Sequence, residues 1–361
     1  MKKLLVCVLA LAMVLSMGAS ALAFEPVPKE EIKVGFVYIG DISDGGYTMA
    51  HHNGTLAMQE ALGLSDDQII IKRNVPETSD CEIALMELIE QGCDIIFGIS
   101  FGYMEYMADL AEQYPDVIFS HCSGYMSNDT NFNNYFGRIY EARYLTGIAA
   151  GLRTENNHLG YVAAMQTPEC IYSMNAYFLG ARSVNPDVTM DVTFTNTWYD
   201  PTIERQAAIA LLDRGVDVLA QHQDTTNPVA AAEERGVWAC GYNADMTEAG
   251  PNAHLTAPIW DWGAYLTDAV QKVIDGTWTS ENVLMGMSEG MVDISPLTKN
   301  VAEGTAEAIE AARASILDGS FGVFVGPIYD NEGNLRVEEG QTLTPEEILA
   351  IDWYVEGITL V

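Results

Sequence analysis

The segment KVGFVYIG, residues 33–40, decides the fold because HLGYVAAM, residues 158–165, repeats it. Each is a short apolar run rich in β-branched and aromatic residues, which is typical of a buried strand. Two further pairs follow in the same order: ALMELIEQGCDIIFG (84–98) with AIALLDRGVDVLAQH (208–222), and VIFSHCSGYMSND (117–129) with GVWACGYNADM (236–246). The chain therefore contains two similar halves, and each half is expected to form a lobe.

Both halves alternate strand-like runs with helical periodicity. In the first half a helix is expected to end at Gly92, with one face formed by Ile83, Met86 and Ile89 and flanked by Leu85 and Leu88. In the second half Asp200 and Pro201 predict a helix start, because an acid at the N-cap precedes proline at the first helical position. This alternation predicts an α/β protein with parallel sheets and helices on both faces. One large doubly wound sheet would not explain the repeat.

The first 23 residues have the pattern of a secretory signal peptide. Lys2 and Lys3 precede an apolar stretch, and Ala21-Leu22-Ala23 provides a cleavage site before Phe24. The alternative is a membrane anchor, for which the apolar stretch is too short. The mature protein is therefore expected in the periplasm or outside the cell.

Charge and cysteine content exclude several classes of protein. The chain has 51 acidic and 17 basic residues, a net charge of −34, so it should repel nucleic acid and anionic membrane surfaces. The six cysteines are scattered without a CxxC pair, which predicts neither a zinc site nor a disulfide framework. Cys93, Cys122 and Cys240 are expected to be small buried residues, although one disulfide stays open.

The predicted binding site lies beyond the carboxyl ends of the strands, where open α/β sheets bind ligands. Aromatic, amide or acidic side chains follow each of these strands, and none of these loops contains Lys or Arg. A phosphate or carboxylate would need a cationic partner. The ligand is therefore expected to be neutral or cationic, to donate hydrogen bonds and to stack on rings. The candidate residues in these loops are Asp41, Asp44, Tyr47, Phe101, Tyr103, Tyr125, Trp198, Asp200, Asp224 and Asp245.

Structural roles compete with ligand contact at several of these positions. Asp200 is expected to cap a helix, to contact ligand, or both, whereas Asp44 and Asp245 look less like caps and are expected to contact ligand. His121 and His222 end equivalent strands and are expected to be buried, hydrogen-bonded histidines.

No catalytic residue, metal or cofactor is predicted. The sequence has no H-E-x-x-H, and no G-x-G-x-x-G after the first strand. A secreted glycosidase or nucleoside hydrolase stays open, because two carboxylates at a suitable separation would suffice for such an enzyme.

The sequence resembles the basic membrane protein family of periplasmic solute-binding proteins, from KVGFVYIGDISDGGYTMAHHNG to LTPEEILAIDWYVEGI. The family pattern of an acid, two residues and an aromatic matches Asp44 to Tyr47, and it implies that Tyr47 stacks on the ligand. The segments NTWYDP and GYNADM match further family pocket segments, which implies contacts from Trp198, Asp200 and Asp245. Nucleoside-binding members have a lysine that holds the ribose, whereas LTAPIWDWGAY (255–265) has none and places Trp260 there.

This resemblance implies a type 1 periplasmic-binding fold, in which two Rossmann-like lobes are joined by a hinge. Lobe 1 would comprise 32–137 and 258–285, lobe 2 would comprise 138–257 and 286–327, and 328–361 would lie near the hinge. The hairpin in that last segment would be turned by Asn331-Glu332-Gly333.

The implied function is capture of a purine base such as adenine, or a nucleoside, for delivery to the membrane permease of an ABC importer. A monomer is expected. A carrier for a sugar or a cationic amine stays open, since acids with stacked rings suit both.

Overall fold

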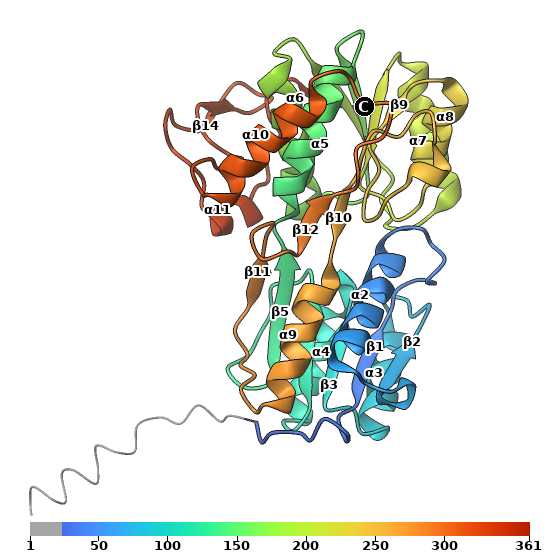
Figure 1. The fold of residues 1–361 in the computed structure, drawn as a ribbon, viewed down its shortest axis with the longest axis vertical. Coiled ribbons are helices and arrows are strands. Elements are labelled where there is room, and N and C mark those ends of the chain that lie inside the picture. Colours follow the sequence, from blue (N-terminus) through green and yellow to red (C-terminus); the bar gives the residue numbers. More distant parts are fainter. Residues whose placement is uncertain (1–23) are drawn as a thin grey trace, which may run out of the picture.

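The structure is a computed structural model that describes residues 24–361, so the predicted signal peptide lies outside the described residues. The chain forms two lobes, one above the other in Figure 1, each with a parallel sheet between layers of helices. Lobe 1 has the strand order β11-β5-β4-β3-β1-β2, with every pairing parallel. Its strands are β1 (Val34–Val37), β2 (Ile69–Lys72), β3 (Ile95–Gly98), β4 (Ile118–Cys122), β5 (Phe132–Gly137) and β11 (Val283–Met285).

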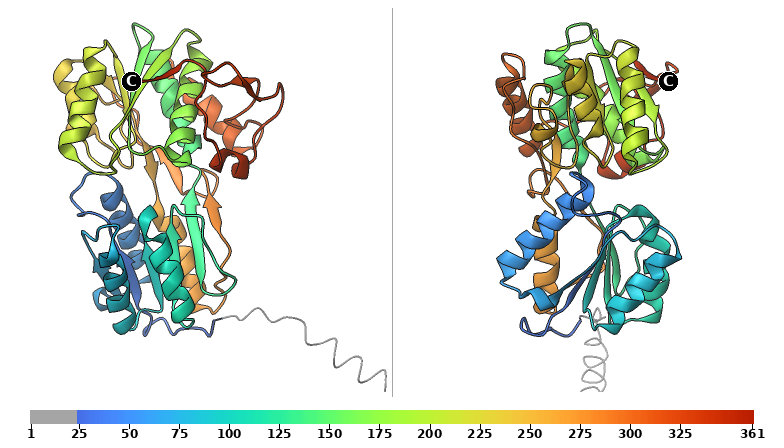
Figure 2. Two further views of the ribbon diagram at one scale, coloured as in Figure 1. Left: turned by 180° about the vertical axis from the view of Figure 1, so that it is seen from behind. Right: turned by 90° about the vertical axis from the view of Figure 1, so that its right-hand side faces the viewer.

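Four helices cover the two faces of the lobe 1 sheet, as Figure 2 shows. Helices α2 (Tyr47–Leu62) and α9 (Trp262–Ile274) pack together on one face, and α3 (Ser79–Glu90) and α4 (Met104–Gln113) share the core of the other. The apolar face predicted for α3 is not its buried face, because Ile83 is 57% exposed and Met86 37% exposed. The helix begins at Ser79 and packs on the sheet through Cys81, Ala84, Leu85 and Leu88.

Lobe 2 has the strand order β15-β7-β6-β8-β9, and its pairings are also all parallel. Its strands are β6 (His158–Ala163), β7 (Thr189–Phe194), β8 (Val218–Gln221), β9 (Trp238–Ala239) and β15 (Ile358–Leu360). Its helices are α5 (Ile139–Arg153), α6 (Pro168–Val184), α7 (Pro201–Asp213), α8 (Asn227–Arg235) and α10 (Thr305–Leu317), and α10 packs on α5. The predicted start of α7 is confirmed, since the Asp200 carboxylate accepts from the N–H groups of Thr202 and Ile203.

Three chain segments connect the lobes. The first is the junction of β5 with α5, and the other two contain β10 (Pro258–Trp260) and β12 (Val292–Ile294), which pair as an antiparallel ribbon between the lobes (Figure 1). Between these two strands the chain returns to lobe 1 to form α9 and β11. Three single-turn 3₁₀ helices lie in the loops: Asp66–Gln68, Phe101–Tyr103 and Thr247–Ala249.

The C-terminal segment packs on lobe 2, and its residues Leu343, Pro345 and Ile348 lie beside Arg138 and Glu141 at the junction of β5 with α5. Its hairpin, β13 (Ile328–Tyr329) with β14 (Leu335–Val337), is followed by α11 (Pro345–Leu349) and then by β15, which adds a parallel edge strand beside β7. The Asn175 side chain on α6 donates to the carbonyl of Trp353 and accepts from the N–H of Val355. The unpaired edge of β7 therefore binds the end of the chain.

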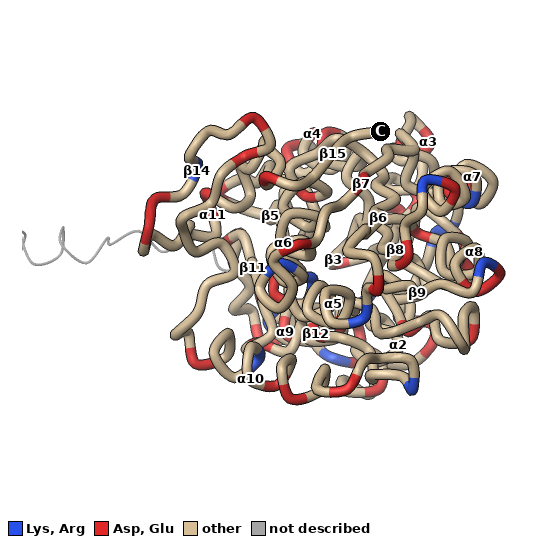
Figure 3. Tube along the Cα trace, turned by 90° about the horizontal axis from the view of Figure 1, so that it is seen from above, with Lys and Arg blue, Asp and Glu red and all other residues tan. Residues whose placement is uncertain are grey.

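Acidic residues are spread along the chain trace, and Lys and Arg are fewer, in the view of Figure 3. The five cysteines of the described residues are all buried and unpaired, as predicted for Cys93, Cys122 and Cys240. Between residues 24 and 361 there is no helix with the length and apolar character needed to span a membrane.

Candidate functional site

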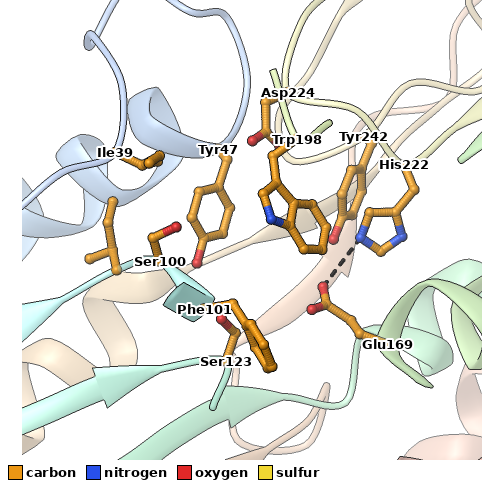
Figure 4. Close-up of a pocket in the computed structure, with 11 residues that line it drawn as sticks. Ile39, Tyr47, Ser100, Phe101, Ser123, Glu169, Trp198, His222, Asp224 and Tyr242 are labelled. Atoms are coloured by element: carbon orange, nitrogen blue, oxygen red, sulfur yellow. Dashed lines mark hydrogen bonds and ion pairs between the residues drawn. The ribbon is translucent and has the colours of Figure 1, made fainter. Parts of the chain in front are cut away.

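A cavity lies between the lobes, where the carboxyl ends of both sheets meet. Its empty volume is about 410 Å³, part of it open to solvent. Both lobes contribute its walls, and none of the lining residues is Lys or Arg (Figure 4). The lining residues are Ile39, Tyr47, Ile99, Ser100, Phe101 and Ser123 from lobe 1, and Glu169, Trp198, His222, Asp224 and Tyr242 from lobe 2.

Tyr47 is the main aromatic residue on the lobe 1 side. It is the first residue of α2, and its hydroxyl donates to Cys122 Sγ at 3.4 Å. The start of this helix is fixed by Asp44, whose two carboxylate oxygens accept from the backbone N–H groups of Gly46, Thr48 and Met49. A helix start has unpaired N–H groups that a nearby carboxylate can satisfy, which explains why Asp44 faces the backbone and not the cavity.

The lobe 2 side is a row of aromatic rings. The Trp198 ring centroid lies 6.3 Å from that of His222, and the His222 centroid lies 4.5 Å from that of Tyr242. Figure 4 shows the rings of Tyr47, Phe101 and Trp198 around the same space. Flat rings on both sides of a cavity suit a flat ligand that can stack.

A buried cation lies behind this wall. The Arg143 guanidinium carbon is 3.8 Å from the Tyr242 ring centroid, and Nη1 donates to the carbonyl of Gln221. Arg143 is fully buried, and it does not line the cavity. Its charge therefore stabilises the wall through a cation–π contact without offering a donor to the ligand.

Asp224 is the buried acid of the site. It is 8% exposed, and Oδ1 accepts from Asn243 Nδ2 at 3.1 Å. Burial, followed by the charges of Asp44 and Glu204, holds the pKa of Asp224 well above its usual value. A buried carboxyl with one donor is short of partners, so it favours a ligand that brings another.

His222 and Glu169 form a second polar pair at the cavity. His222 Nε2 lies 3.2 Å from Glu169 Oε1, and burial lowers the pKa of His222 below its usual value. A neutral imidazole with Nε2–H facing Glu169 leaves Nδ1 as an acceptor. His222 is thus buried as predicted, but it is part of the cavity wall, and Nδ1 has no partner among the described residues. His121 does have partners for both ring nitrogens, Ser100 O and Asn134 Nδ2.

Four of the predicted residues line the cavity, namely Tyr47, Phe101, Trp198 and Asp224. Their contact with ligand stays a prediction.

Five other predicted residues make local hydrogen bonds and do not line the cavity. Asp44 and Asp200 cap helices, and Asp41 accepts from the N–H and hydroxyl of Ser43. Asp245 does not line this cavity: its 48%-exposed carboxylate accepts from the N–H and hydroxyl of Thr247, and the residue lines a second groove between α2 and residues 243–245. Tyr103 is fully buried, and its hydroxyl donates to the carbonyl of Val75.

The two remaining aromatics lie outside the cavity. Tyr125 is 74% exposed, with its ring centroid 6.4 Å from that of Phe101. Trp260 is buried behind the site, where it lines a separate groove between α2, β10 and residues 243–245.

Several lining residues were not predicted. Ser100, Ser123 and Tyr242 do lie in the loops that follow the predicted strands, but they were not among the candidates chosen there. Glu169 comes from the start of α6, after β6, and the loop following that strand was not among the predicted ones. Ile39 and Ile99 are apolar strand ends, and nothing in the sequence distinguishes them from core residues.

The two-lobed fold and interlobe cavity agree with the sequence comparison. The profile of the family described as ABC transporter substrate-binding protein PnrA-like (Bmp) matches residues 31–321. The chain belongs to this family. Its members are substrate-binding components of ABC transporters, so the protein binds a small molecule and has a membrane permease as its partner.

Several curated relatives are similar over most of the chain. A purine-binding protein of Brucella abortus is 36% identical over 330 residues, covering 91% of this chain and 93% of the relative. A putative ABC transporter glucose-binding protein of Haloferax volcanii is 38% identical over 309 residues, covering 86% and 78%. An ABC transporter nucleoside-binding protein of Lactococcus lactis is 23% identical over 254 residues, covering 65% and 72%.

Solved structures confirm the type 1 periplasmic-binding fold. A solute-binding protein of an ABC transporter system from Aeropyrum pernix matches with a TM-score of 0.69 and 20% identity, covering 83% of this chain and 93% of that one. One from Conexibacter woesei matches with a TM-score of 0.67 and 20% identity, covering 80% and 97%.

Proposed function

We propose that this PnrA-like protein captures a purine base or nucleoside in the interlobe cavity and delivers it to an ABC importer. The observation that carries the proposal is the combination of stacking rings, Tyr47 and Trp198, with the buried carboxyl of Asp224 and no Lys or Arg among the lining side chains. Purine bases have flat faces and N–H donors on their edges, and a carboxylate is a strong acceptor for such donors. The Brucella relative is named for purine binding, which supports the same class.

Adenine is the preferred ligand within this class. Its exocyclic amino group and imidazole N–H are both donors, and Asp224 and Glu169 offer acceptors from the same lobe. A nucleotide would bring negative charge next to Asp224, whose neighbours Asp44 and Glu204 already disfavour its ionisation. Phosphorylated ligands should therefore be rejected.

A sugar is the second candidate, because the Haloferax relative is named as a putative glucose-binding protein. Carboxylates and aromatic rings also suit a pyranose, whose hydroxyls donate and whose apolar face stacks. In either case the protein is a carrier that acts as a monomer outside the cytoplasmic membrane, and it performs no chemistry on its ligand.

Thermal shift and calorimetry on refolded, ligand-free protein test the proposal. The panel is adenine, guanine, adenosine, adenosine monophosphate, glucose and putrescine. We expect stabilisation by adenine and none by the monophosphate. Stabilisation confined to glucose would replace the purine assignment with the sugar one. Turnover of adenosine to base and ribose would contradict the carrier role.

A further inference from the structure

A chain of hydrogen bonds leads from the hinge to the cavity through three buried side chains. Trp260 Nε1 donates to Asn243 Oδ1 at 2.9 Å, and Asn243 Nδ2 donates to Asp224 Oδ1 at 3.1 Å. Trp260 is 6% exposed, Asn243 1% and Asp224 8%. Trp260 belongs to β10, which connects the lobes, and Asp224 lines the cavity. The two hydrogen bonds therefore link the hinge to the site.

The chemistry of the indole fixes the direction of this chain. An indole N–H can only donate, so the Asn243 atom that it contacts must be the amide oxygen. The Asn243 amide nitrogen then faces Asp224 and must donate to it. Asp224 Oδ1 therefore accepts from Asn243, and Oδ2 has no partner among residues 24–361.

We propose that Trp260 and Asn243 are positioning residues that hold Asp224 with one oxygen occupied and the other presented to the ligand. This inference rests on the proposed function, since it says how the site would recognise a purine N–H. Oδ2 is the oxygen that meets the ligand: it accepts from an N–H donor when Asp224 is ionised. When Asp224 is neutral its proton lies on Oδ2, because Oδ1 accepts from an amide N–H.

The position of Trp260 explains why it can serve as a fixed anchor. Its ring stacks on Trp262 with centroids 4.5 Å apart and an interplanar angle of 18°, and it lies 5.1 Å from the Phe136 ring centroid. A Cβ on Gly137 would lie 2.5 Å from Trp260 Cζ3, so the ring lies against the backbone of β5, another connecting segment. Residues of two hinge segments therefore hold the indole that orients Asn243.

Asn243 is suited to its place between Trp260 and Asp224. Its φ is +70°, a left-handed conformation that asparagine tolerates better than most residues. Its amide is the only donor to the Asp224 carboxylate among the described residues. Burial and the charges of Asp44, Glu204 and Glu169, which face Asp224, raise the pKa of that carboxyl, and the hydrogen bond from Asn243 lowers it. Loss of this donor should therefore raise the pKa of Asp224 further.

The test compares three variants of the full-length mature protein. Trp260→Phe keeps the stacked ring but removes the donor to Asn243, and Asn243→Gly removes the amide while accepting the positive φ. Trp262→Phe is the matched control, because it changes an indole of the same stack whose Nε1 has no partner among the described residues. The readouts are the ¹³C-detected titration of the Asp224 carboxyl in ligand-free protein and calorimetry with adenine.

We expect the Asp224 midpoint to move to higher pH in Trp260→Phe and Asn243→Gly, and adenine affinity at pH 7 to fall about tenfold in both. Trp262→Phe should leave the midpoint unchanged. An unchanged midpoint in both test variants would overturn the inference, whatever their affinity. If the wild-type protein does not bind adenine but the Asp224 titration midpoints of the variants move as expected, the purine assignment is overturned. The orienting role of Trp260 and Asn243 is then still supported.

Discussion

The contact between Gly46 and Asp224 predicts that a single methyl group can prevent closure of the cleft. Gly46 precedes α2 in lobe 1, and a Cβ built on it would lie 2.4 Å from the Asp224 carbonyl oxygen and 2.9 Å from the carbonyl carbon. Ordinary contacts begin near 3.4 Å, so the lobes of Gly46→Ala would have to separate by about 1 Å at this point. The obstacle is backbone, which cannot rotate away as a side chain can.

The expected effect on affinity follows from the cost of overpacking. Inserting a methyl group into a well-packed contact costs typically about 1–3 kcal/mol. This penalty applies only when the lobes meet, so it should appear as a roughly 5- to 150-fold loss of adenine affinity. The hydrogen bonds of Gly46 use its backbone, since its N–H donates to Asp44 and its carbonyl accepts from the N–H of Ala50, and alanine retains both.

Calorimetry with adenine and small-angle scattering with and without ligand measure this effect. The wild-type protein should become more compact when it binds, and Gly46→Ala should do so less. The melting temperature of the ligand-free variant is the control, because a loss there would indicate damage to α2. Wild-type affinity together with wild-type compaction would refute the argument that this contact belongs to the ligand-bound state.

Three further predictions concern side chains in and near the cavity. Tyr47→Ala and Trp198→Ala should each weaken adenine binding about ten- to a hundredfold, because stacking is worth roughly 1–3 kcal/mol per base; wild-type affinity by calorimetry would place the ligand elsewhere. Asp245→Asn should leave adenine affinity within about twofold, because its carboxylate binds Thr247; a larger loss would return Asp245 to the site. Asp224→Asn should raise the melting temperature of the ligand-free protein at pH 7. Because burial raises the pKa of Asp224, the folded state keeps a proton that the unfolded state loses above about pH 4, so this residue makes stability fall as pH rises. Melting temperatures that differ equally at pH 4 and pH 8 would contradict this.

The architecture could be predicted because the sequence contains an internal repeat. Buried parallel strands read as continuous apolar runs, and the order of these runs repeats between residues 33–129 and 158–246. The buried face of α3 was less predictable. Its solvent side also has apolar residues, Ile83 and Met86, so periodicity alone allowed more than one inward face. The docking of the C-terminal strand beside β7 depends on a free sheet edge, which has no local signature in the sequence.

The acids of the site show where sequence reasoning stops. Every acid in these loops lies near the start of a helix or turn, where free backbone N–H groups compete for its carboxylate. Asp44, Asp200 and Asp245 accept from such groups within five residues of the chain. Asp224 precedes a helix too, yet Thr225 Oγ1 accepts from the N–H of Asn227 in its place. Local hydrogen bonds therefore decide which carboxylate stays available to a ligand. Composition and spacing do not reveal these bonds.

The availability of Asp224 ties ligand binding to closure of the lobes. Its Oδ1 accepts from Asn243 and its Oδ2 has no partner among the described residues, so a ligand that donates to Oδ2 adds a second hydrogen bond to a largely buried carboxyl. Its carbonyl oxygen is the surface against which Gly46 of lobe 1 packs. Asp44, the cap of the helix that begins beside Gly46, also raises the pKa of Asp224 across the cleft. Bringing the lobes together without a ligand therefore buries an acid near like charges, and a ligand that donates a hydrogen bond to that acid offsets this cost. Closure should accordingly be favoured only around a donor, which is the behaviour that a permease needs in order to distinguish a loaded carrier from an empty one.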